Sequence, residues 1–179
     1  MATGNVMKLS PIDHAPEEEM TWLTSSSLSI VVVGASGDLA KKKTYPSLLN
    51  LYDDNLLPKD TLIWGFARSS LTDNDLRDRL RPYLLKENHS ESVVDGFLQI
   101  CRYQGGKEYG DLDAFGVLKS SIEAHESDHP ENVKSNRLFY FAIPPNVFAE
   151  TGIAIKKTCM QDDSKGFTRM IVEKPFGRE

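Results

Sequence analysis

The stretch IVVVGASGDLAKKKTYPSLLNLY, residues 30–52, decides the fold class. Four apolar residues run into Gly34, and Gly37 follows three positions later. The continuous β-branched run predicts a strand buried on both faces, over Leu28–Val33. Apolar residues then recur at the spacing of one helix face, at Tyr45, Leu48, Leu49 and Tyr52. Strand, tight turn and helix in direct succession predict the first unit of an α/β fold.

The turn carries the pattern GxxGxxA, and each small residue has a mechanical use. Gly34 permits a sharp turn, Gly37 lets a diphosphate approach the backbone, and Ala40 lets the helix pack on the strand. The free N–H groups at the helix start then face the anion. An ordinary strand–helix turn is the structural alternative. A phosphate loop of the NTPase type is disfavoured because Lys42, not glycine, precedes Lys43-Thr44.

Further strands and helices alternate along the chain. The predicted strands are Leu62–Ala67, Arg137–Ile143 and Arg169–Glu173. One predicted helix begins at the N-cap Thr72 and has a break or kink at Pro82. The other predicted helices cover Ser92–Cys101, Asp111–His125 and Val147–Cys159. The fold class is therefore α/β, a Rossmann-like parallel sheet flanked by helices over residues 28–179.

Composition narrows the class of protein. The 179 residues fit one domain, and the net charge of −5 argues against a nucleic-acid partner. No apolar run reaches the roughly 20 residues that span a membrane. Residues 1–27 are polar and acidic without a signal core, which predicts a flexible tail and a cytoplasmic protein.

The cysteines and histidines suggest no metal site. Cys101 and Cys159 lack metal or redox spacing, so we expect buried, reduced thiols. The four histidines lie in polar surroundings and are expected to be solvated; they are His14, His89, His125 and His129.

Two basic residues follow predicted strands. NAD sites usually end their second strand in a carboxylate that takes the ribose 2′-hydroxyl, whereas Leu62–Ala67 is followed by Arg68. A guanidinium suits a 2′-phosphate, so NADP is favoured over NAD.

Lys41, Lys42 and Lys43 add positive potential or form a solvated helix face. Lys174 ends the last strand where ligands of open parallel sheets bind, although many such lysines are only solvated.

Four motifs together identify a family. GASGDLAKKK (34–43), WGFARSSL (64–71), NRLFYFAIPPNVF (136–148) and IVEKPFGRE (171–179) resemble, in order and spacing, the amino-terminal part of glucose-6-phosphate dehydrogenase. The resemblance covers about residues 28–179. It implies an NADP-dependent enzyme that oxidises glucose 6-phosphate to 6-phosphogluconolactone, at the head of the pentose phosphate pathway.

The resemblance also assigns roles to single residues. It implies that Arg68 grips the 2′-phosphate, that Lys174 contacts cofactor and sugar phosphate, and that Ala142–Phe148 lies along the cofactor. Phe148 stands where a tyrosine is common, so a phenol contact is lost. The segment implied to wrap the diphosphate consists of Gly34, Ala35, Ser36, Gly37, Asp38, Leu39, Ala40 and Lys41.

The same resemblance leads us to expect a fragment. The family's catalytic histidine lies in a motif close to RIDHYLGKE, which this sequence does not contain, and a large carboxyl-terminal α+β domain builds the oligomer interface. We therefore expect no catalytic residue here, NADP binding without turnover, and a family homo-oligomer whose interface domain is not included. A stand-alone, non-catalytic NADP-binding module is the alternative. A chain that does not fold stably alone is a third possibility.

Overall fold

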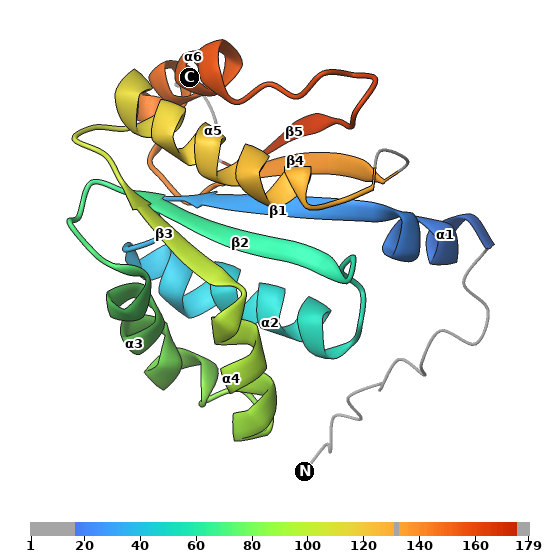
Figure 1. Ribbon diagram of the computed structural model, residues 1–179. Helices are drawn as coiled ribbons and strands as arrows, with labels where there is room; N and C mark the ends of the chain where they lie inside the picture. Colours follow the sequence, from blue (N-terminus) through green and yellow to red (C-terminus); the bar gives the residue numbers. More distant parts are fainter. Residues whose placement is uncertain (1–16, 131–132, 175–179) are drawn as a thin grey trace.

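A computed structural model describes residues 17–130 and 133–174 (Figure 1). Its centre is a five-stranded sheet with the spatial order β3-β2-β1-β4-β5, in which all neighbouring strands run parallel. The strands are β1 (Ser26–Val33), β2 (Asp60–Ala67), β3 (Cys101–Gly105), β4 (Lys134–Phe141) and β5 (Thr168–Val172). The predicted Rossmann-like α/β fold is confirmed.

Helices cover the two faces of the sheet. One layer holds α2 (Tyr45–Asp53), α3 (Asp73–Leu84) and α4 (Glu91–Gln99), and the other holds α5 (Leu112–Ser127) and α6 (Phe148–Thr158) (Figure 1). The short elements are α1 (Glu17–Ser25), the π-helical turn η1 (Ala40–Thr44) and the 3₁₀ turn η2 (Pro145–Val147). No helix of the described residues is both long and apolar enough to cross a membrane.

Strand β1 is the centre of the core. All eight of its residues are buried, because a helix layer covers each face of the sheet. Ile30 and Val32 pack into the cluster beneath α2, α3 and α4, whereas Val31 and Val33 pack beneath α5 and α6. Each such side chain stabilises the fold by about 1.5–3 kcal/mol. The quoted apolar run therefore fixes the position of the turn that follows it.

The start of α3 follows the prediction, and its end does not. Thr72 is the N-cap, and its side chain and that of Asp75 form a reciprocal capping box. Of the break or kink expected at Pro82, the break is wrong, because the helix continues to Leu84; the kink stays a prediction. Pro82 lies in the last turn, where a proline removes only one intrahelical hydrogen bond. Leu80 and Leu84 remain fully buried around it.

Strand β3 replaces the end of a predicted helix. The helix expected over Ser92–Cys101 ends at Gln99, and Cys101 begins β3. This strand, CRYQG, has one buried residue followed by four that are partly buried. Its sequence shows neither an apolar run nor a clear alternation, so the strand signal is weak.

The flexible tail expected over residues 1–27 contains regular structure from Glu17 onward. Helix α1 occupies Glu17–Ser25, and β1 begins at Ser26, two residues before the predicted start. Residues 1–16 lie outside the described part of the chain. The first residues of β1 include Ser26, Ser27 and Ser29, which are buried although polar. The start of this strand therefore lacks the apolar pattern that predicts a buried strand.

The last strand differs from the others in its exposure. β5 pairs with β4 and forms the edge of the sheet. Its apolar side chains remain 41–53 % exposed, at Met170, Ile171 and Val172. The sheet is thus covered at its centre and open at the β5 edge.

Candidate functional site

The glycine turn lies at the carboxyl ends of β1, β2 and β4. The N–H groups of Gly34 and Ala35 both donate to the Phe66 carbonyl on β2, at 2.7 and 3.2 Å. From the other side, the Ala142 N–H donates to the Val33 carbonyl at 2.8 Å. Neighbouring strands on both sides therefore fix the turn.

Gly34 is required by this geometry. Its φ of +91° lies in the region that side chains with a Cβ disfavour. A Cβ at this position would come within 2.3 Å of the Ala142 carbonyl oxygen. The role predicted for Gly34, a sharp turn, therefore agrees with its backbone.

The following residues present an open backbone. The Gly37 N–H donates to the Gly34 carbonyl at 2.9 Å and closes the turn, and Gly37 is exposed. A Cβ at Gly37 would meet only the Gly34 carbonyl oxygen, at 3.1 Å, so the outer side of the turn is free. Ala40 is fully buried at the start of η1. N–H groups in a first helical turn have no intrahelical acceptor, which suits an anion.

Arg68 lies beside this turn. It follows β2 directly, is exposed, and its guanidinium carbon stands 5.1 Å from the centre of the Tyr109 ring. The next residue, Ser69, donates a hydrogen bond from its hydroxyl to that of Ser36 in the glycine turn, at 3.1 Å. The segment that carries Arg68 is therefore joined to the glycine turn by the Ser69–Ser36 hydrogen bond. Sequence reasoning missed Tyr109, which no spacing rule connects to Arg68.

The three lysines do not act as one patch. Lys41 and Lys42 pair with Asp38 at 3.2 and 2.9 Å. These hydrogen bonds, with Lys42 the stronger partner, lower the pKa of the exposed Asp38 carboxyl. Lys43 instead lines an apolar groove together with Glu173. The positive potential expected from all three lysines is thus divided between two places and partly offset by Asp38.

Lys174 stands two residues beyond β5 and is exposed. Phe141 and Val172 are paired, so β4 and β5 end at the same level of the sheet. Lys174 follows the carboxyl end of β5, which lies two strands away from β1. The hydroxyl of Tyr140 on β4 donates to the Glu173 carboxylate just before it. Burial, with this carboxylate, raises the pKa of Tyr140 to about 12, so the phenol is a neutral donor.

Phe148 begins α6 and is partly buried. Its ring centre lies 5.6 Å from that of Phe141, and it packs against the core beneath α5 and α6. The structure thus gives Phe148 a packing contact, and its expected position along a cofactor stays a prediction.

The histidines lie elsewhere, and the expectation that they are solvated is wrong for the three described ones. His89 bonds Asp53 and Asn50, at 2.6 Å each, and its side chain is 13 % exposed. The His129 side chain is 9 % exposed, lies 3.7 Å from Asp60 at the start of β2, and packs edge-on against His125. His14 lies outside the described residues.

The thiols match expectation. Cys101 and Cys159 are both free and fully buried. Burial raises the pKa of Cys101 to about 12 and raises that of Cys159 as well. Neither thiol is therefore a reactive thiolate at neutral pH.

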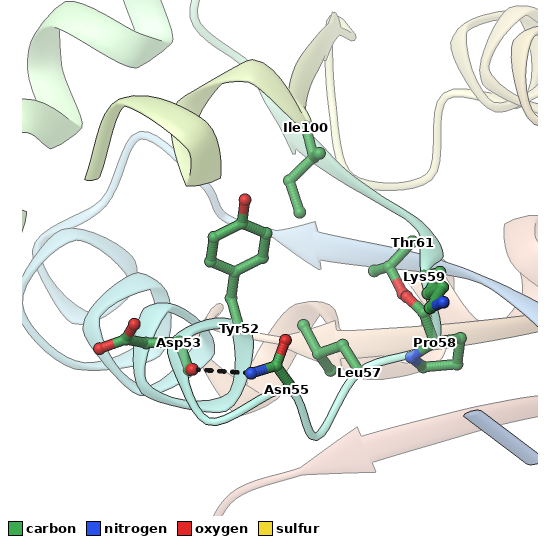
Figure 2. A pocket seen from close by; sticks show the side chains of 8 residues that line it. All are labelled: Tyr52, Asp53, Asn55, Leu57, Pro58, Lys59, Thr61 and Ile100. Atoms are coloured by element: carbon green, nitrogen blue, oxygen red, sulfur yellow. Dashed lines mark hydrogen bonds between the residues drawn. The ribbon is translucent and has the colours of Figure 1, made fainter. Parts of the chain in front are cut away.

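A separate hollow of about 380 Å³ lies where β2 and β3 begin (Figure 2). Tyr52, Lys59 and Ile100 are among its lining residues, and Thr61 near the start of β2 closes one side. Asn55, in a left-handed conformation with φ of 55°, donates its amide to the Asp53 carbonyl at its rim. None of the predicted site residues lines this hollow.

Known proteins share this arrangement. Residues 31–179 match the family described as "Glucose-6-phosphate dehydrogenase, NAD binding domain". A cytoplasmic isoform of glucose-6-phosphate 1-dehydrogenase from Solanum tuberosum is 46 % identical over 170 residues, covering 93 % of this chain and 32 % of that protein. The chloroplastic enzyme from Spinacia oleracea is 39 % identical, covering 97 % of this chain and 29 % of its own length.

A solved structure gives the same result. Glucose-6-phosphate dehydrogenase in complex with its substrate glucose-6-phosphate superposes with a TM-score of 0.77 at 37 % identity. The match covers 86 % of this chain and 31 % of that one, so the chain spans about a third of the length of the proteins it matches. From the glycine turn, the parallel sheet and the match over residues 31–179, it follows that the chain belongs to the glucose-6-phosphate dehydrogenase family and carries its NAD binding domain.

Proposed function

We propose that this chain is the NADP-binding part of an enzyme that oxidises glucose 6-phosphate to 6-phosphogluconolactone. The observation that carries the proposal is the position of Arg68. It follows β2, where NAD-selective domains place a carboxylate, and it stands on the Tyr109 ring beside the glycine turn. A guanidinium held at this place recognises a 2′-phosphate.

The turn fits a dinucleotide. Gly37 leaves the outer side of the backbone open, and the first helical N–H groups would bind the diphosphate. A cofactor held there would supply a nicotinamide able to take a hydride from C1 of the sugar. The residues proposed to hold the cofactor remain those from Gly34 to Lys41, with Arg68, Phe148 and Lys174.

Lys174 is proposed to hold the sugar phosphate as well as the cofactor. It is exposed at the strand edge where ligands of parallel sheets bind. Its ammonium would attract a phosphate or donate to a sugar hydroxyl. The likeness to a protein solved with glucose-6-phosphate supports this substrate.

The base that accepts the hydroxyl proton is proposed to come from outside this chain. Such a base must reach hydrogen-bond distance of the sugar. His125 and His129 lie near Asp60, at the amino edge of the sheet, and His89 bonds Asp53 at the end of α2. None of these three stands at the glycine turn, which favours cofactor binding without turnover by the isolated chain.

Partners and location follow the relatives. A cytoplasmic location is proposed from the potato relative, although a chloroplastic enzyme also matches. Homo-oligomer formation through a further domain is proposed from the family resemblance. A stand-alone NADP-binding module without catalysis is the second candidate, favoured by the positions of the three described histidines.

Calorimetric titration of the purified 179-residue chain with NADP and NAD tests the proposal. We expect NADP to bind more tightly, and Arg68→Ala to weaken NADP about ten- to a hundredfold while leaving NAD nearly unchanged. Arg169→Ala is the matched control, because this exposed arginine also covers an aromatic ring, Phe167, at 4.2 Å but lies on β5. Equal losses for both cofactors would refute the role of Arg68.

Turnover separates the two candidates. Added glucose 6-phosphate and NADP should give no NADPH absorbance with the isolated chain. A chain extended by the rest of the enzyme should produce NADPH if the dehydrogenase proposal is right, and none if the chain serves only as a binding module.

A further inference from the structure

Tyr103 on β3 reaches the loop that carries Arg68. Its hydroxyl lies 2.7 Å from the Ser69 carbonyl oxygen and 3.2 Å from the Ala67 carbonyl oxygen. These two carbonyls flank Arg68 in the chain. The phenol has one proton to share between these two acceptors, and it thereby contacts the carbonyls of both residues that neighbour Arg68.

Tyr103 is itself firmly placed. Its backbone N–H donates to the Asp73 carboxylate at 2.7 Å, which ties it to the first turn of α3. β3 pairs in register with β2, so that Tyr103 lies opposite Gly65 and Gly105 opposite Ala67. The phenol therefore projects from a rigid strand and not from a loop.

The chemistry of the phenol suits this contact. Burial raises the pKa of Tyr103 to about 12, so the hydroxyl keeps its proton and donates throughout the physiological range. The loop also packs closely on β3, because a Cβ at Gly105 would lie 3.2 Å from the Ser69 carbonyl oxygen. These contacts leave the Arg68 backbone little freedom.

We infer that Tyr103 is a positioning residue for the 2′-phosphate site, which acts by fixing the Arg68 loop. The inference rests on the proposed NADP function. Tyr109 supports the guanidinium from below, whereas Tyr103 holds the backbone that carries it. A ligand without a 2′-phosphate does not need a fixed Arg68, so Tyr103 contributes to selectivity between cofactors.

The test replaces Tyr103 by phenylalanine and uses four probes on the 179-residue chain. NADP and adenosine 2′,5′-bisphosphate carry the 2′-phosphate, whereas NAD and adenosine 5′-monophosphate do not. We expect Tyr103→Phe to weaken the first two about three- to tenfold, as the loss of one neutral hydrogen bond does, and to leave the other two within about twofold. Tyr52→Phe, on α2 and away from the loop, is the control.

A double-mutant cycle makes the test specific. If Tyr103 acts through Arg68, Tyr103→Phe should have little further effect in the Arg68→Ala background. A general loss of stability would lower the affinities of all four probes together, so the ratio of NADP to NAD affinity reports on position alone.

Three outcomes are possible, and each decides whether Tyr103 acts through Arg68. A fall in the NADP to NAD ratio that disappears in the Arg68→Ala background supports the inference. An unchanged ratio, or an equal effect in both backgrounds, overturns it while leaving the NADP proposal in place. A wild-type chain that binds NADP no better than NAD overturns the proposed function first, and the inference with it.

Discussion

Replacing Gly34 by alanine perturbs the turn at the point where its geometry is most demanding. The φ of +91° is strained for any residue with a Cβ, and the added methyl would come within 2.3 Å of the Ala142 carbonyl oxygen and 2.8 Å of an Ile143 methyl. Backbone strain of this kind costs about 1–3 kcal/mol, and overpacking a further 1–3 kcal/mol. The neighbours are a paired strand end and a buried side chain, so they cannot move aside at small cost. We expect Gly34→Ala to lower the free energy of unfolding by about 2–6 kcal/mol.

Urea denaturation followed by circular dichroism measures this change. For a slope of about 2 kcal/mol per molar urea, the midpoint should fall by roughly 1–3 M without a change in slope. Gly116→Ala is the matched control, because beyond the adjoining residues and backbone of α5 nothing lies within 4 Å of the Cβ position. Alanine is the better helix former there, so the control should gain up to about 1 kcal/mol. A Gly34→Ala variant as stable as the wild type would refute the argument from the turn.

Two further predictions concern the sheet edge and pH. Ile171 on β5 is 41 % exposed, and Ile171→Lys would place a charge on this apolar edge. The variant should self-associate only at a higher protein concentration, as measured by light scattering, and its NADP affinity should be unchanged. Unchanged self-association would contradict this. Burial, and then the neighbouring His129, lower the pKa of His125 below its ordinary 6.5, against opposing effects of Asp60 and Glu126. The unfolded state therefore binds more protons, and stability falls as pH drops below about 6.5. Between pH 7.5 and 5.5, His125→Gln should lose less stability in urea titrations than the wild type; equal losses would show that His125 does not contribute.

The sequence predicted best where periodicity and turn chemistry agree. The run from Ile30 to Val33 and the glycine turn predicted a buried strand and a sharp reversal, and both are present. The capping pair at Thr72 likewise marked the start of α3. In each case local residues alone determine the backbone, so no knowledge of the rest of the chain is needed.

The misses have a common cause in tertiary context. β3 is short and mostly polar, and it forms because its backbone groups pair with those of Ile63–Ala67 on β2. The histidines at 125 and 129 lie in a polar stretch, yet the end of α5 and the residues after it bring their side chains against the start of β2. Burial of this kind depends on the packing of distant elements, which a window of neighbouring residues does not contain.

The site shows the same division. Gly34 and Arg68 could be found from the ends of predicted strands. Their supporting residues could not, because Tyr103 lies on a strand that was not predicted and Tyr109 follows it. Contacts such as the Ser36–Ser69 hydrogen bond join residues 33 positions apart, and only the fold brings them together.

The open edge at β5 has a consequence during protein synthesis. Ribosomes extend a chain at about 5–20 residues per second, and domains tend to fold as they emerge. In the longer relatives, this sheet would be translated well before the remaining two-thirds of the chain. For tens of seconds, a nascent chain that begins with the present sequence would display the glycine turn beside an edge strand with exposed Met170, Ile171 and Val172. That interval is when a chaperone, or a neighbouring nascent copy on the same messenger, would meet this edge.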